Sequence, residues 1–115
     1  MNQLILNKEH LAEQIKLIRD LPSLLYRLAR IPFVWNPDEA CIMIIDKFRQ
    51  RAQSKDFQEQ PIARQTFVEL LEHIRDEPVA LLALLEIVQI CEACPHQRIW
   101  DVTAAKQIIK EYLHA

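Results

Sequence analysis

Residues 36–52, NPDEACIMIIDKFRQRA, contain the clearest helix start and the clearest apolar face in the chain. Asn36 is a typical N-cap residue, and Pro37 fits the first helical turn because it has no N–H to leave unpaired. The two carboxylates that follow suit the positive end of the helix dipole. Apolar residues then recur within an arc of roughly 100°: Cys41, Ile44, Ile45, Phe48 and Ala52. The stretch predicts an amphipathic helix with one buried face.

Prolines divide the rest of the chain in the same way, and there is no glycine. They stand at Pro22, Pro32, Pro37, Pro61, Pro78 and Pro95. Proline stops a preceding helix and is tolerated in the first turn of the next. The apolar spacing between them predicts helices over 7–20, 20–31, 36–52, 61–75 and 78–94, and a last one after the cap residue Asp101. Residues 78–94 are apolar nearly all round, which indicates a central helix.

The fold class follows from these segments. No stretch alternates with the period of a strand, and glycine-based hairpin turns cannot form, so we expect an all-α chain of about six short helices. The length, 115 residues, fits a single domain, 1–115. The break at Asp76-Glu77-Pro78 resembles armadillo-type repeats over about a third of the chain. The irregular proline spacing favours a compact orthogonal bundle instead.

The composition of the chain limits the classes of binding partner and the cellular compartment that we expect. A net charge of −2 gives no strong attraction to nucleic acid or to acidic membranes. The N-terminal stretch lacks the features of a signal peptide. The longest apolar stretch of the chain is interrupted by glutamates and a glutamine and is too short to cross a bilayer. Three cysteines, an odd number, are then expected to be reduced, and we predict a cytoplasmic protein.

The segment Cys91-Glu92-Ala93-Cys94-Pro95-His96 is the one cluster with metal-binding character. Zinc sites use four Cys or His ligands, and no second paired motif completes the set. A redox role is disfavoured because the thiols lie at the C-terminal end of a helix, where the dipole opposes a thiolate. We expect Cys91 to pack in the core and no metal or cofactor to bind. A metal-dependent regulator using Cys91, Cys94 and His96 remains the alternative.

Catalytic and nucleic-acid motifs are weak. A lone Glu-x-x-His, Glu111 to His114, lies on the fraying last residues, and no loop can cradle phosphate without glycine. We therefore expect no enzymatic activity. The basic run from Lys47 to Lys55 admits weak nucleic-acid binding as a further alternative, but cations also suit the C-terminal end of a helix.

Apolar residues outside the helical stripes carry the leading hypothesis. They are Phe33, Val34, Trp35, Ile42 and Met43. Aromatic residues and methionine are enriched in interface cores, so these residues predict a non-enzymatic protein-binding module of the adaptor, inhibitor or immunity type. The partner would be another protein or a second copy of the chain. Alternatively, the same residues fill gaps in a small bundle.

Overall fold

The computed structural model describes residues 7–54 and 60–114, without the side chains of Pro32 and Phe33, and confirms an all-α chain. Its elements are α1 (Lys8–Leu17), α2 (Leu21–Tyr26), the 3-10 helix η1 (Arg27–Phe33), α3 (Pro37–Ala52), α4 (Arg64–Ile74), α5 (Pro78–Glu92) and α6 (Val102–Leu113). Ile62 and Ile99 form an isolated parallel bridge. Among the described residues no backbone φ is positive, which fits a chain without glycine because other residues adopt positive φ only at a steric cost.

Side-chain caps set four of the helix starts. They are made by Asn7, Asp20, Asn36 and Asp101. In each case the side-chain oxygen accepts a hydrogen bond, 2.7 to 3.1 Å long, from the N–H of the third residue on. Each cap satisfies one of the donors that a helix start otherwise leaves open.

Two boundaries differ from the prediction, each for a local reason. Pro32 lies inside η1 instead of stopping a helix before it, because a 3-10 turn continues from α2. The fourth helix begins at Arg64 and not at Pro61, because the backbone of Ile62 is engaged elsewhere. Its N–H donates to the Arg98 carbonyl at 2.8 Å, and its carbonyl accepts from the N–H of Trp100 at 3.0 Å.

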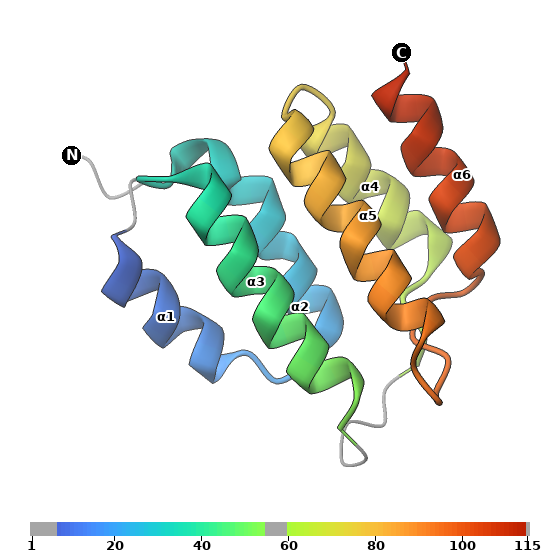
Figure 1. Cartoon of the computed structure of the whole chain (residues 1–115), viewed down its shortest axis with the longest axis horizontal. Coiled ribbons are helices and arrows are strands. Elements are labelled where there is room, and N and C mark those ends of the chain that lie inside the picture. Colours follow the sequence, from blue (N-terminus) through green and yellow to red (C-terminus); the bar gives the residue numbers. More distant parts are fainter. Residues whose placement is uncertain (1–6, 55–59, 115) are drawn as a thin grey trace.

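The helices alternate between two layers along the chain. In Figure 1, α1, α3 and α5 run side by side in front, α2 and α4 lie behind, and α6 closes one edge. The molecule measures 40 × 37 × 20 Å, and its smallest extent equals about two helix diameters. The compact bundle is therefore confirmed, but its front helices run alongside one another instead of crossing orthogonally. This layering is closer to stacked helical hairpins.

Helix α5 is central, as predicted, although it ends at Glu92 and not at residue 94. It packs against α3, α4 and α6. Its buried residues are Ala80, Leu81, Ala83, Leu84, Ile87, Val88, Ile90 and Cys91. Because the helix is covered on several sides, its sequence needs little amphipathic character.

A buried cation that the sequence did not reveal fixes the connector between α5 and α6. The Arg98 side chain is only 4% exposed. Its Nε donates to the Ala52 carbonyl at 3.2 Å, and an Nη donates to the Ser54 carbonyl at 3.1 Å. These carbonyls lie at the negative end of the α3 dipole, where a cation is favoured. Arg98 therefore ties the end of α3 to this connector.

Candidate protein-binding surface

The predicted surface residues occupy different environments. Ile42 is 58% exposed on α3, and the neighbouring Met43 is partly exposed. Val34 and Trp35 are half-buried and pack against the core. The side chain of Phe33 lies outside the described part of the structure. The structure thus brings Ile42 and Met43 to the surface together, whereas Val34 and Trp35 largely serve packing.

The connector before α3 is held at the top of the α1–α3 pair. Lys8 Nζ on α1 lies 2.9 Å from Glu39 Oε1 on α3. This hydrogen bond to Lys8 is the main reason that the pKa of Glu39 is lowered, and a hydrogen bond from Trp35 lowers it further. Trp35 therefore lies beside the first turn of α3 while packing against the core.

Leu82 joins Ile42 on the outer face of α3 and α5. It is 56% exposed, while Arg49 on α3 and Glu86 on α5 meet across the same side, 3.3 Å apart. Ile42 lies two turns before Arg49 on α3, and Leu82 lies one turn before Glu86 on α5. Residues separated by one or two turns share a helix face, so Ile42 and Leu82 lie on the faces that carry this ion pair. We call Ile42 and Leu82 the outer apolar pair. The all-round apolar sequence of α5 concealed Leu82, because it suggested complete burial.

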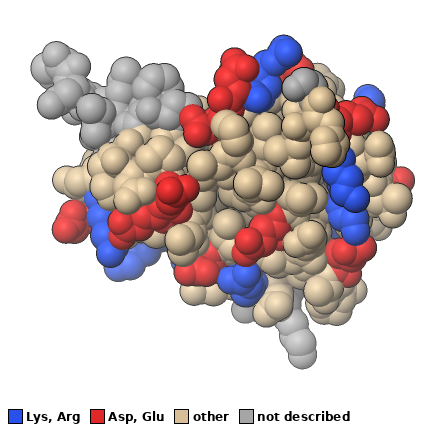
Figure 2. Space-filling view, turned by 45° about the horizontal axis from the view of Figure 1, so that its top comes forward, with Lys and Arg blue, Asp and Glu red and all other residues tan. Residues whose placement is uncertain are grey.

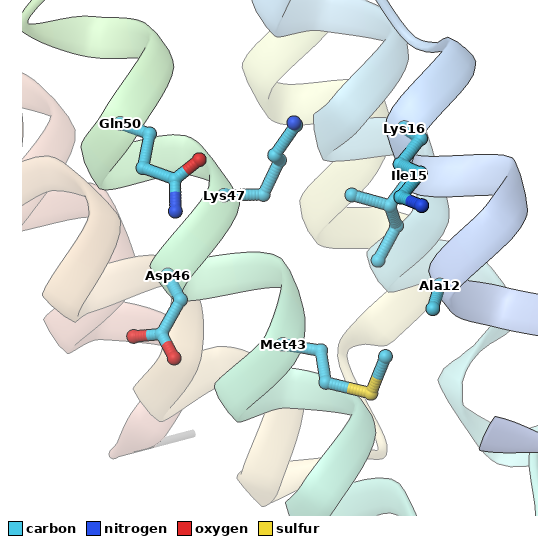
Figure 3. Close-up of a pocket in the computed structure, with 7 residues that line it drawn as sticks. All are labelled: Ala12, Ile15, Lys16, Met43, Asp46, Lys47 and Gln50. Carbon is cyan, nitrogen blue, oxygen red and sulfur yellow. The ribbon is translucent and has the colours of Figure 1, made fainter. Parts of the chain in front are cut away.

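A groove lies between α1 and α3, and one of its lining residues, Met43, directly follows Ile42 in the chain. It is lined by Ala12, Ile15, Lys16, Met43, Asp46, Lys47 and Gln50 and has a volume of about 300 Å³. Figure 3 shows Met43 extending from α3 toward Ala12 on α1, and Lys47 also reaching toward α1. The α1–α3 groove therefore combines an apolar floor with a basic end.

The cysteine cluster does not assemble a metal site. Within 7–54 and 60–114, no three His, Cys, Asp or Glu side chains are placed to hold a metal ion together. Cys91 is buried, as predicted, and burial raises the pKa of its thiol to about 12. The Cys94 thiol donates to the Ile90 carbonyl at 3.2 Å, and His96 is exposed. Cys91 and Cys94 thus behave as packing thiols at the end of α5.

The basic run is dispersed around α3. Lys47 lines the groove, Arg49 pairs with both Asp46 and Glu86 on the outer face, and Lys55 lies outside the described residues. On the face seen in Figure 2, lysines and arginines alternate with acidic residues around a broad uncharged area. That pattern offers no continuous track for a phosphate backbone on this face.

Comparison with known proteins adds no functional information. No family model matches the sequence, and neither the curated proteins nor the solved structures give a match. None of the helices formed by the described residues combines the length and the apolar run that crossing a membrane requires. The functional argument therefore depends on the geometry alone.

Proposed function

We propose that this chain is a protein-binding module that uses the front layer, with the outer apolar pair and the α1–α3 groove as its contact surface. The carrying observation is the exposure of Ile42 and of Leu82 on two adjacent helices, each on the side of its helix that carries the Arg49–Glu86 ion pair. Apolar side chains clustered on a surface mark contact sites more often than scattered ones do. An adaptor, inhibitor or immunity-type role would use such a surface without any catalytic group.

A rigid mode of binding fits the backbone. Short capped helices and proline-marked starts leave few places where the chain could hinge. A preorganised surface loses less conformational entropy on association than a mobile one does. We also propose a reducing compartment, the cytoplasm, where the three free cysteines would stay as thiols.

Site-specific photo-crosslinking tests the proposal. A photoreactive phenylalanine analogue is placed at Ile42 or at Leu82 and, as a matched control, at Tyr26, which is 46% exposed at the end of α2 in the back layer. We expect positions 42 and 82 to give the same discrete adduct in the native cell and position 26 to give none. An adduct of twice the chain mass would identify a second copy as the partner.

Stability measurements accompany this test. Because both positions are exposed, each substitution should change the free energy of unfolding by no more than about 0.5 kcal/mol. Equal adduct yields from all three positions, or none from 42 and 82 with a folded protein, would reject the proposed surface.

A further inference from the structure

The α1–α3 groove has a regular sequence of facing residues along its length. At the top, Lys8 on α1 pairs with Glu39 on α3 at 2.9 Å. One turn further along both helices, Ala12 faces Met43, and one more turn brings Lys16 and Lys47 to the groove. The two parallel helices therefore present an opposite-charge pair, an apolar pair and a like-charge pair in succession.

The like-charge pair lacks a counter-ion. Within the described residues, neither Lys16 nor Lys47 forms an ion pair, whereas Lys8, Arg49, Arg75 and Lys106 do. The carboxylate among the residues that line the groove, Asp46, accepts a hydrogen bond from Arg49 Nη1 at 3.1 Å, and Figure 3 shows it turned away from α1. The basic end of the groove thus carries uncompensated positive charge, which attracts an anion.

The apolar part of the groove is adapted to receive a side chain. Ile15 is 5% exposed and closes the floor, while Ala12 leaves room opposite Met43. Methionine has an unbranched, polarizable side chain that adjusts to different apolar shapes. This part therefore suits a leucine-sized or methionine-sized side chain from outside.

We propose that the α1–α3 groove binds an acidic amphipathic helix of a partner protein, with an apolar side chain between Ala12 and Met43 and a carboxylate between Lys16 and Lys47. The Ala12–Met43 pair and the Lys16–Lys47 pair are one helical turn apart. Two residues four apart in the sequence of the bound helix have the same spacing, so one can contact each pair. Charge complementarity selects this occupant over a basic or a wholly apolar one. The inference rests on the proposed protein-binding function and specifies the partner's chemistry.

A peptide selection tests the proposal on the full chain. The probe is a displayed library of 16-residue helix-forming peptides, randomised on one face. We expect enrichment of Asp or Glu one turn from Leu, Met or Phe. The best peptide should bind about tenfold more weakly to Lys16→Glu or Lys47→Glu, but equally well to the control Lys110→Glu, which is exposed on α6.

Charge reversal gives the sharpest outcome. A peptide with Lys in place of its selected carboxylate should recover binding to the Lys16→Glu/Lys47→Glu variant. Should that double variant fail to fold, Lys16→Gln and Lys47→Gln are used singly, and the same direction of loss is expected. Recovery supports the proposal, and an unchanged preference overturns it.

The remaining outcomes separate the two proposals. Selected peptides without carboxylates, whose binding is lost in Ile42→Glu/Leu82→Glu, would overturn the acidic-helix inference and leave the proposed function standing. Peptides insensitive to both sets of substitutions would overturn both. Displacement of the best peptide by a single-stranded oligonucleotide at lower concentration would replace the protein partner with nucleic acid and also overturn the inference.

Discussion

Helix α3 meets its two front-layer neighbours in opposite ways. On one side Cys41 and Phe48 are buried, and the Cys41 thiol lies 4.0 Å from the Val79 carbonyl of α5. On the other side a groove of about 300 Å³ lies between α3 and α1, and the two lysines at one end of it have no ion-pair partner among the described residues. Helix α3 therefore has two different helix–helix contacts. We call the packed contact with α5 the closed seam and the grooved contact with α1 the open seam.

The contrast shows how a small chain can divide stability from recognition. The closed seam removes apolar surface from water, which is the main stabilising contribution in folding. The open seam leaves apolar and charged groups incompletely satisfied, as expected of a surface that a ligand completes. Changes on the two seams of α3 should therefore affect different properties.

The largest difference is expected from truncating one side chain on each seam. Phe48→Ala on the buried stripe should lower the free energy of unfolding by about 3–5 kcal/mol, because Phe48 is fully buried. Met43→Ala, on the open seam, should cost about 1 kcal/mol. Chemical denaturation measures both, and equal losses would show that the seams do not differ.

The anchor at the C-terminal end of α3 comes next. Arg98→Met leaves two carbonyls without a charged donor and should lower stability by about 2–3 kcal/mol. Arg64→Met, at an exposed position on α4, is the control and should change little. If Arg98→Met is as stable as this control, the bond between the α5–α6 connector and the end of α3 does not stabilise the fold.

The helix caps should sharpen the comparison. Asn36→Ala removes the cap of α3, the shared helix, and should cost about 1 kcal/mol of global stability. Asn7→Ala removes the cap of α1 and should mainly speed hydrogen exchange of the α1 amides, since only the open seam joins α1 to α3. Equal global losses from both variants would indicate that α1 unfolds with the rest of the bundle.

The smallest effect is expected from the Lys8–Glu39 pair across the open seam. The pKa of Glu39 is lowered and the pKa of Lys8 is raised, each mainly by their mutual hydrogen bond. The pair should therefore stabilise the fold between about pH 4 and pH 10 and lose this effect as either partner is neutralised beyond those limits. Comparing the pH dependence of unfolding with Lys8→Gln isolates it. A difference that persists at pH 2 would exclude this origin.

Sequence patterns predicted the all-α fold and the start of α3 because they depend on local chemistry. The Asn36 cap, the first-turn proline and the apolar stripe each act within a few residues. The central place of α5 was equally readable from its apolar composition. Helix ends were less accurate where a long-range contact intervened, as at Ile62, whose partner lies beyond α5.

The candidate surface was only partly predictable. Ile42 and Met43 were identified because they fall outside the buried stripe of α3. Leu82 was missed because it lies on the central helix α5. Whether one position of such a helix is exposed depends on how far the neighbouring helices extend over it. The facing of Lys16 by Lys47 depends on the register between two helices, and no single-helix pattern specifies that register.

The absence of positive φ values has a practical consequence for mutagenesis. Every described residue has backbone dihedral angles that a residue with a β-carbon adopts without strain. Alanine or cysteine can therefore replace it without moving the main chain to another φ/ψ region. At positions other than proline, loss on substitution then reports the side chain and its helix propensity, without a contribution from backbone strain. The described chain can therefore be scanned position by position with spectroscopic labels, and the resulting map would trace the contact surface without interference from backbone strain.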